Sequence, residues 1–353
     1  MENVFKYHIV LLLLWGGCIA IPTGTFAEEG SHAAEFLSHG VGARALGMGG
    51  AFVSVADDAT AAYWNPAGLT RIQNHAFSMM YSDSFGVEGG NLLNKGLVTY
   101  NFVNYVHQIE GIGGVGVSWI RLGVDNIPKT TFIDTNENGI LGDFQDINGN
   151  GIKDEGELYI DRPDVEEYFS NTDDAVLISY ARQINPKLAV GGNLKLLRQS
   201  IFENSGTGFG IDLGLMAEPL RALRVGATLQ DATGTQIRWN TEARPTFTRN
   251  RRMRLGVSYN VATAMIGEMT FGADLETGAK DLAEGSGGGP LFRIGAEYRL
   301  FKMIALRVGA AGGKLAIGSG LHLRIDRATL SVDYAFNAHD LGNSQRISIS
   351  GFF

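Results

Sequence analysis

The sequence has almost no cysteine, little proline and no excess of positive charge. Its single cysteine, Cys18, lies in the first 27 residues, so the rest of the chain can form neither a disulfide nor a thiolate metal site. With 8 prolines among 353 residues, it is not a Pro/Gly-rich disordered chain. The net charge of −8, from 29 Lys and Arg against 37 Asp and Glu, leaves no basic stripe to neutralise phosphates, which excludes nucleic acid as a partner.

The chain also lacks the residue constellations of common enzymes. It contains no His-Glu-x-x-His zinc motif, no Gly-x-Ser-x-Gly nucleophile turn and, beyond Cys18, no cysteine nucleophile. The glycine-rich run at 47–50 lacks the third glycine of a dinucleotide-binding loop at the required offset, and no strand precedes it. We therefore expect a protein that is not an enzyme.

The first 27 residues have the form of a secretion signal. Lys6 supplies a positive charge, residues 9–17 form a short apolar stretch, and Thr25 and Ala27 place small residues at −3 and −1, which predicts cleavage after Ala27. One alternative is a retained membrane anchor, for which the apolar stretch falls well short of the roughly 20 residues needed. Another is a lipoprotein signal ending at Cys18, whose preceding residues fit poorly. After residue 27, no run is apolar enough for a transmembrane helix.

What the sequence does contain is glycine, 48 residues in all, and a two-residue alternation of apolar and polar-or-small side chains. In residues 291–300, Phe292 and Ile294 share one face, and Arg293 and Glu297 share the other. Such alternation is typical of β-strands, and segments of about 9–11 residues suit a tilted crossing of a bilayer. About fourteen such segments begin near His75, Lys95, Gly113, Asp173, Leu188, Gly208, Leu223, Arg251, Glu268, Leu291, Ile304, Leu315, Ala328 and Ser344.

The lengths of the connections favour a closed barrel over a soluble β-sandwich or β-solenoid, which the same alternation also allows. Tight turns, at 185–186, 301–303 and 326–327, alternate with a set that includes the longest connections, at 125–172, 232–250 and 278–290. Short periplasmic turns and long outer loops are expected of a barrel with both ends in the periplasm.

We therefore predict an all-β fold: a transmembrane antiparallel β-barrel of about 14 strands over residues 75–353, with 125–172 as a long extracellular loop. Its location would be the outer membrane of a Gram-negative-type bacterium, in contact with outer-membrane lipid. The final residues support this prediction, because Ile347, Ile349 and Phe353 lie on one face and the chain ends on an aromatic residue. We interpret Phe353 as part of a signal for the barrel-insertion machinery.

Residues 28–74 precede the first alternating segment, and the part at 40–70 does not alternate but contains three motifs in one stretch. These are GARALGMGGAF at 42–52, ADDA at 56–59 and WNPAGL at 64–69. The stretch resembles the N-terminal signature of PorV/PorQ-type outer-membrane proteins, relatives of the FadL-type outer-membrane transporters. The resemblance implies that this segment folds back into the barrel as a luminal plug, or hatch, with Asn65, Pro66 and Ala67 inside it. The rest of the chain matches that family in architecture only.

The resemblance implies two alternative functions. The closer family implies a part in type IX-type protein secretion, as a component that binds cargo or translocon partners. The more distant one implies a FadL-like channel for uptake or export of hydrophobic small molecules such as fatty acids. A lumen closed by the plug, with an exposed apolar loop patch, would favour the first function. A tunnel lined by aromatic residues, with a hydrophobic ligand, would favour the second.

Two adjacent carboxylates, Asp57 and Asp58, lie in the predicted plug. An unpaired carboxylate in a tight lumen would be unfavourable, so we expect them to pair with inward-facing arginines. The candidates are Arg293, Arg299, Arg252 and Arg254. The alternative is that the two residues cap a short helix beginning at Ala59.

The predicted long loop contains a match to a twelve-residue Ca²⁺-binding template. Its candidate ligands are Asp146, Asn148, Asn150, the backbone of Ile152, Asp154 and Glu157, with Gly151 at the turn position. A similar unit twelve residues earlier offers a second, weaker site with Asp134, Asn136, Asn138 and Asp143, but it lacks a terminal Glu. We predict structural Ca²⁺ that stiffens the loop; the alternative is a solvated, turn-rich loop.

Overall fold

The computed structural model describes residues 33–84, 98–263, 267–277, 289–338 and 342–353, which belong to one compact unit. The signal peptide predicted for residues 1–27, with its cleavage site, therefore lies outside the described residues. Among the described residues, no helix has the length and apolar character needed to span a membrane.

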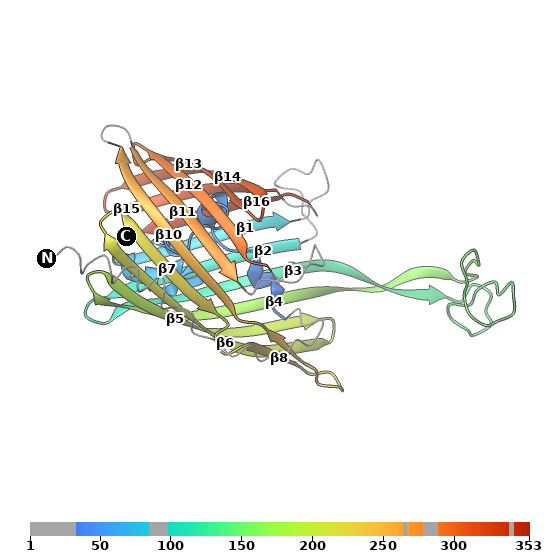
Figure 1. The fold of residues 1–353 in the computed structure, drawn as a ribbon. Helices are drawn as coiled ribbons and strands as arrows, with labels where there is room; N and C mark the ends of the chain where they lie inside the picture. Colours follow the sequence, from blue (N-terminus) through green and yellow to red (C-terminus); the bar gives the residue numbers. More distant parts are fainter. Residues whose placement is uncertain (1–32, 85–97, 264–266, 278–288, 339–341) are drawn as a thin grey trace. The chain divides into compact units, whose positions relative to one another are not determined.

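Sixteen antiparallel strands form a single sheet, and fourteen of them close into a barrel (Figure 1). The order β5-β4-β3-β2-β1-β16-β15-β14-β13-β12-β11-β10-β7-β6 is closed by pairing of β5 with β6. The barrel strands are β1 (His75–Ser84), β2 (Val98–Ile109), β3 (Gly113–Ile133), β4 (Arg162–Asn185), β5 (Leu188–Ile201), β6 (Asn204–Leu220), β7 (Leu223–Gln230), β10 (Arg252–Thr263), β11 (Gly267–Thr277), β12 (Leu291–Leu300), β13 (Ile304–Ala311), β14 (Lys314–Ile325), β15 (Ala328–Asn337) and β16 (Ser344–Phe352). The predicted fourteen-stranded barrel is confirmed.

Alternation along each strand separates an inner face from an outer face. In β3, Ser118 and Ile120 point inward and are fully buried. Val117 and Trp119, which alternate with them, point outward and are 54% and 37% exposed. The exposed outward side chains are largely aliphatic and aromatic on most strands. An apolar outer face of this kind is suited to lipid rather than water.

One hairpin is much longer than its neighbours. Strand β3 runs on to Ile133 and β4 begins at Arg162, and these two residues are paired at its far end. The loop predicted at 125–172 is therefore reduced to residues 134–161. Acidic residues on the start of β4 hide the strand pattern in the sequence, which is why β4 was expected to begin only near Asp173. Figure 1 shows this hairpin projecting well beyond the other strands.

A second hairpin fills the loop that was predicted at 232–250. Strands β8 (Thr235–Trp239) and β9 (Thr246–Arg249) pair with each other, and β8 pairs with the Gly206–Phe209 part of β6. The remainder of β6 pairs with β7. Strand β6 therefore changes partner along its length.

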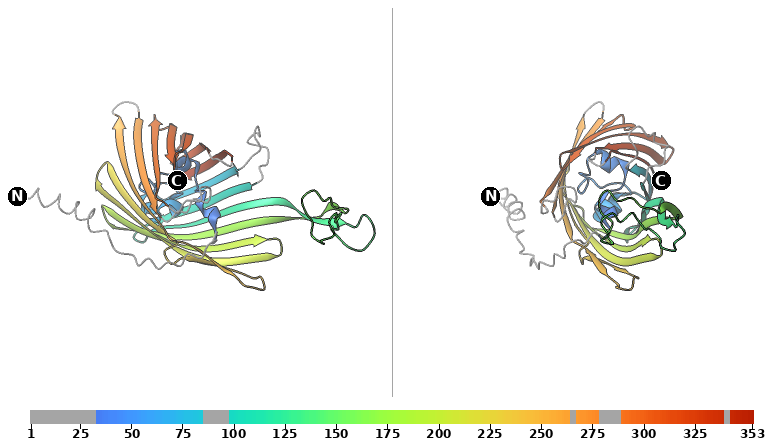
Figure 2. Two further views of the ribbon diagram at one scale, coloured as in Figure 1. Left: turned by 45° about the vertical axis from the view of Figure 1, so that its right-hand side comes forward. Right: turned by 90° about the vertical axis from the view of Figure 1, so that its right-hand side faces the viewer.

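Within the described ranges, the helices all lie in the N-terminal segment, residues 33–72, which we call the luminal segment. They are η1 (Glu35–Ser38), α2 (Ala43–Gly47), α3 (Ala61–Trp64) and η2 (Pro66–Arg71). Helix α2 contacts β13 to β16, whereas η2 contacts β2 to β6 on the other side of the barrel. The end-on view in Figure 2 shows the segment surrounded by the strands.

Glycines on the barrel wall allow the luminal segment to approach the strands closely. A Cβ at Gly295 or Gly309 would collide with the backbone of Met48, and one at Gly191 would lie 2.5 Å from the carbonyl carbon of Pro66. Glycines on seven strands face the backbone of the segment in this way: Gly114, Gly191, Gly226, Gly272, Gly295, Gly309 and Gly318. These seven of the chain's 48 glycines therefore serve backbone-to-backbone packing.

Candidate functional site

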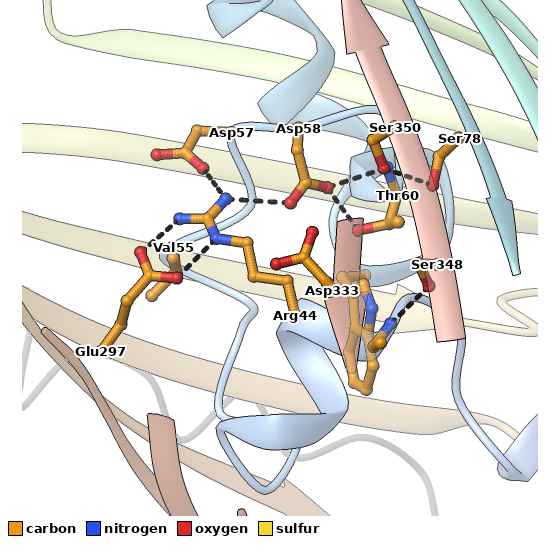
Figure 3. A network of polar contacts seen from close by, with 12 residues as sticks. Arg44, Val55, Asp57, Asp58, Thr60, Ser78, Glu297, Asp333, Ser348 and Ser350 are labelled. Carbon is orange, nitrogen blue, oxygen red and sulfur yellow. Dashed lines mark hydrogen bonds and ion pairs between the residues drawn. The ribbon is translucent and has the colours of Figure 1, made fainter. Parts of the chain in front are cut away.

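Arg44 of α2 connects the luminal segment to the barrel wall (Figure 3). Its Nη1 donates to Asp57 at 2.7 Å and to Asp58 at 2.9 Å, while its Nε donates to Glu297 of β12 at 3.0 Å. Glu297 also accepts from Arg307 of β13 at 2.7 Å. These buried charges form one continuous chain, in which Arg44 is the cation that both aspartates share with Glu297 of the wall.

Burial and neighbouring charge shift the pKa values of the two aspartates in opposite directions. Burial alone would raise the pKa of Asp57, but the charges of Arg44 and Arg224 outweigh it and hold that pKa below its usual value. Burial prevails at Asp58, where the charge of Asp57 adds to it, so the pKa of Asp58 is raised despite Arg44. Asp58 is therefore the first of the pair to take up a proton as the pH falls.

The arginines named from the sequence do not contact Asp57 or Asp58. Two of them, Arg254 and Arg293, instead pair with Glu276 of β11 at 2.8 and 2.7 Å. The remaining two pair with other carboxylates, Arg252 with Glu35 and Arg299 with Glu297. The expected arginine partners are present but are other residues: Arg44 of the same segment and, for Asp57, Arg224 of β7 at 3.4 Å.

The capping alternative holds in part for Asp58. Its Oδ1 accepts a hydrogen bond from the backbone N–H of Thr60 at 2.9 Å, one residue before α3. The first helical residue is Ala61 rather than Ala59, and no side chain caps the helix directly. Asp58 therefore shapes the turn that leads into α3 while it also pairs with Arg44.

Asn65 ties two parts of the luminal segment to each other and to the wall. It is fully buried, and its Nδ2 donates to the carbonyls of Val53 at 2.8 Å and of Leu215 in β6 at 3.0 Å. Its Oδ1 accepts from the N–H of Ala67 at 3.1 Å, so Asn65 also caps η2, which begins at Pro66. An amide side chain is suited to this position because it donates and accepts at once.

Polar cavities lie beside the Arg44 chain. One, of about 350 Å³, is lined by Arg44, Asp58, Asp333 and a row of hydroxyls that includes Ser348. A second, of about 480 Å³, is lined by Arg44, Asp57, Arg224 and Glu297 among others. Both cavities include Arg44, so this arginine lies between them.

The opposite inner wall is apolar. Strand register places four apolar residues side by side across this wall: Phe102 of β2, Ile120 of β3, Ala175 of β4 and Leu197 of β5. These side chains belong to one buried core with Phe36 of the luminal segment. The same core contains Leu37, Tyr100, Leu177 and Ile237, with Leu122 and Trp239 packed against it. The lumen therefore has a charged side along β10 to β15 and a largely apolar side along β2 to β5, where the buried Lys195 of β5 pairs with Asp212 of β6 at 2.8 Å.

The far end of the β3–β4 hairpin folds its predicted calcium-binding residues into a tight loop. Both Asp146 carboxylate oxygens accept backbone N–H groups, including that of Gly151 at 2.8 Å. Asp154 accepts from the amides of Asn148 and Asn150. Glu157 is buried, and its two oxygens accept from the N–H of Ile147 at 2.8 Å and of Asp154 at 2.9 Å.

The earlier loop repeats this pattern with a residue that the sequence analysis missed. Asp143 accepts from the amides of Asn136 and Asn138, as Asp154 does in the second loop. The place of Glu157 is taken by Asp161, which accepts from the N–H of Thr135 at 2.8 Å and of Gly142 at 2.8 Å. The spacing template could not identify Asp161, because it reaches the loop from 27 residues beyond its first residue.

In the described part of the chain, no three His, Cys, Asp or Glu side chains gather closely enough to form a metal site by themselves. The two loops would depend on Asn side chains and backbone carbonyls as well, which are ligands that Ca²⁺ accepts. Calcium at Asp146 and its neighbours therefore stays a prediction.

The C-terminal Phe353 lies at the seam between the first and last strands. Its ring stacks on His75 with centroids 5.2 Å apart, and the backbones of the two residues exchange hydrogen bonds. The position fits a residue that is read when the barrel closes, but the interpretation as an insertion signal stays a prediction.

Comparison with known proteins identifies relatives by structure only. No protein-family model matches the sequence, and a search of curated proteins finds no match. Among solved structures, the CymD monoaromatic hydrocarbon channel aligns over 89% of this chain and 98% of its own, with a TM-score of 0.53 and 16% identity.

Two further solved structures give similar values. The Ralstonia pickettii toluene transporter TbuX covers 88% of this chain and 97% of its own, with a TM-score of 0.52 and 15% identity. The P. putida toluene transporter TodX covers 88% and 96%, with a TM-score of 0.50 and 13% identity. Identities this low establish the fold alone. That fold is the FadL-like outer-membrane barrel, in agreement with the predicted outer-membrane location.

Proposed function

We propose that this chain is an outer-membrane channel for hydrophobic small molecules. The observation that carries the proposal is the apolar inner wall of β2 to β5, where Phe102, Ile120 and Leu197 face the lumen. A wall of this kind offers an apolar ligand a route that the charged side of the lumen does not. The structural likeness to hydrocarbon channels supports the same choice, whereas no comparison supports a secretion role.

The luminal segment would act as the plug of this channel. Phe36 and Leu37 of η1 pack against the apolar wall, so they lie where a ligand moving along it would compete with them. Arg44 and Asn65 hold the rest of the segment to the barrel wall. A ligand would therefore compete with the apolar contacts of Phe36 and Leu37, while the ion pairs of Arg44 would stay in place.

The test is uptake of toluene and of oleate by cells that express the full chain and lack other hydrophobic channels. We expect uptake above that of cells with an empty vector. Phe102→Asn should lower the rate by about tenfold, because it places an amide in the apolar wall. The matched control is Ser331→Asn, which adds the same amide on the polar wall at β15 and should leave the rate unchanged.

Two results would overturn the proposal. One is uptake by the wild-type chain no faster than the empty-vector rate, with heat-modifiable folding showing that the barrel is inserted. The other is equal uptake by Phe102→Asn and Ser331→Asn.

A second candidate, a PorV-like component of type IX-type protein secretion, is supported by the N-terminal motifs, by the luminal segment packed inside the barrel and by the projecting hairpin. The hairpin end exposes large apolar side chains, among them Ile147 at 76% and Leu158 at 67%. Exposed apolar residues on a projection are typical of interaction sites. Co-purification of an exported protein that is lost when residues 134–161 are replaced by a short turn would favour this candidate over the channel.

We also propose that the two hairpin loops bind structural Ca²⁺ and that Phe353 addresses the chain to the barrel-insertion machinery. The matched hydrogen-bond patterns around Glu157 and Asp161 support the first proposal. The stacking of Phe353 on His75 at the barrel seam supports the second. Deletion of Phe353 should lower the inserted, heat-modifiable fraction in vivo; an unchanged fraction would contradict it.

A further inference from the structure

The outward face of β2 to β6 carries a hollow of about 750 Å³ whose lining is almost entirely apolar. Strand register places one row of its lining residues side by side: His107, Val115, Tyr180, Gly192 and Leu213. Gly192 has no side chain and Val115 has a short one. The barrel surface is therefore low at these positions and higher on either side.

A second row of outward side chains, parallel to the first, also lines the hollow. It runs through Tyr105, Val117, Ile178, Leu194 and Ile211 on the same five strands. Within the first row, the Tyr180 hydroxyl donates to the carbonyl of Ile112 at 2.8 Å, which holds its ring toward the turn between β2 and β3. The result is a groove across the outer wall with its open side toward the surrounding medium.

Arg182 does not line the groove itself, but strand register places it just beyond the groove on β4. It is the next outward residue of β4 after Tyr180, opposite Val190, and its side chain is exposed. On the β3 side, no side chain lies next to Arg182, because the neighbouring residue there is Gly113. Among the described residues, Arg182 takes part in no ion pair. A guanidinium so placed is available to a phosphate, which it binds with two parallel hydrogen bonds.

The orientation of the barrel identifies the leaflet. Strands β4 and β5 are joined at Pro186 and Lys187 by a tight turn, the kind of connection expected on the periplasmic side. The groove therefore lies in the periplasmic half of the wall, with Arg182 nearer the headgroup level than Tyr180. This step rests on the proposed placement in an outer membrane, and it is independent of what passes through the lumen.

We infer that this groove is a binding site for one glycerophospholipid of the periplasmic leaflet, with an acyl chain over Gly192 and the phosphate on Arg182. In a bilayer, the gain comes from filling a hollow that a mobile lipid shell would leave poorly packed. The charge-assisted hydrogen bond at the interface adds selectivity for a phosphate.

The test is native mass spectrometry of the full chain, reconstituted in vesicles of phosphatidylethanolamine and phosphatidylglycerol and extracted in mild detergent. The wild-type barrel should retain one phospholipid. Val115→Trp, which fills the groove, and Arg182→Gln, which removes the phosphate partner, should each lower the retained fraction by about tenfold. The matched controls are Val308→Trp, on the outer face of β13, and Arg327→Gln, in the β14–β15 turn; both should retain lipid as the wild type does.

Each other outcome rejects the inference. Equal retention by Val115→Trp and Val308→Trp would mean that the groove holds no specific lipid. Loss of retention in Val115→Trp with none in Arg182→Gln would mean an apolar occupant without a phosphate.

Val115→Leu replaces the tryptophan variant in this test if Val115→Trp fails to fold. Toluene uptake should be unaffected in all variants, so failure of uptake in the wild type would overturn the channel proposal and leave the lipid site standing.

Discussion

The barrel lumen and the far end of the β3–β4 hairpin use the same residue types for different physical reasons. In the lumen, Gly309 and Gly295 are needed because a Cβ would collide with the backbone of Met48. In the hairpin, Gly149 and Gly151 have open space around them, but their φ angles of +72° and +75° favour glycine. Glycine therefore has two separate structural roles within this chain.

Carboxylates differ between the two regions in the same way. In the lumen, Glu276 and Glu297 are paired with arginines of neighbouring strands. Residues 134–167 hold eleven acidic residues and two basic ones, a net charge of −9 against −8 for the whole chain. There the acidic side chains accept backbone N–H groups, as Asp146 does, and remain available to solvent cations. The lumen neutralises its charges internally, whereas the hairpin end leaves them for its surroundings.

The largest effect in this comparison should come from Arg44→Met. It leaves Asp57, Asp58 and Glu297 without a shared cation, and loss of one partner from a buried pair costs about 3–5 kcal/mol. The free energy of unfolding, measured by urea titration of the barrel in detergent, checks this. Lys129→Met removes an exposed ion pair of the hairpin and should leave the free energy of unfolding unchanged, because an exposed pair is screened by solvent. Similar effects for the two variants would remove the distinction between lumen and hairpin.

A slightly smaller effect is expected from Gly309→Val. The added side chain must displace the luminal segment at Met48, and overpacking of this kind costs about 3 kcal/mol. The readouts are the same urea titration and the protease sensitivity of the luminal segment. Gly151→Asn in the hairpin is the matched control, because Asn tolerates a positive φ and no atoms lie close to Gly151. We expect it to change the free energy of unfolding by roughly a few tenths of a kcal/mol. An intact segment in Gly309→Val would show that close packing is not required.

Calcium should act on the hairpin alone. At a Ca²⁺ concentration about a hundredfold above Kd, binding would stabilise the loops by about 2.7 kcal/mol and leave the barrel unchanged. Limited proteolysis within residues 134–161, with Ca²⁺ or with chelator, measures this. Asp146→Ala together with Glu157→Ala should abolish protection of the second loop, and Asp161→Ala that of the first.

The control for calcium is Glu155→Ala, which removes an exposed acid that contacts neither loop centre in the described structure. Cleavage of the wild-type hairpin at the same rate in calcium and in chelator would show that neither loop binds the ion.

The smallest expected effect is a pH dependence of the first hairpin loop. Hydrogen bonds from the backbone N–H of Thr135, with further ones from Gly142 and Asp143, hold the pKa of Asp161 below its usual value. The stability that Asp161 contributes is therefore present above about pH 4, the ordinary value for an aspartate, and is lost as the pH falls through the lowered one. Hydrogen exchange at the Thr135 and Gly142 amides should speed up there, corrected for intrinsic rates. Asp161→Asn should abolish the dependence; if the variant keeps it, another group is responsible.

The sequence was informative wherever a pattern of two residues decides the structure. The predicted strand starts at Leu188, Leu223, Leu291, Ile304 and Ala328 match the observed ones. A strand that faces lipid on one side and the lumen on the other must alternate, so its register can be read from the chain itself. The fourteen-stranded barrel follows from that pattern and from the parity of its turns.

Features that depend on distant residues could not be predicted in the same way. Asp161 completes a loop that begins at Asp134, and no local motif connects the two residues. The β8–β9 hairpin was missed because its two short strands lack a long alternating stretch. The outer groove could not be foreseen either, since it needs the register of five strands to bring Gly192 beside Tyr180 and Leu213.

The luminal glycines have a consequence for how the barrel assembles. Seven strands touch the backbone of a segment that precedes all of them in the chain, so a fully closed wall would have little room to admit it afterwards. We expect the strands to close around the segment, which would then serve as a template for the curvature of the wall. Segment and wall should consequently unfold in one transition, and a barrel made from residues 75–353 alone should fail to reach the native state.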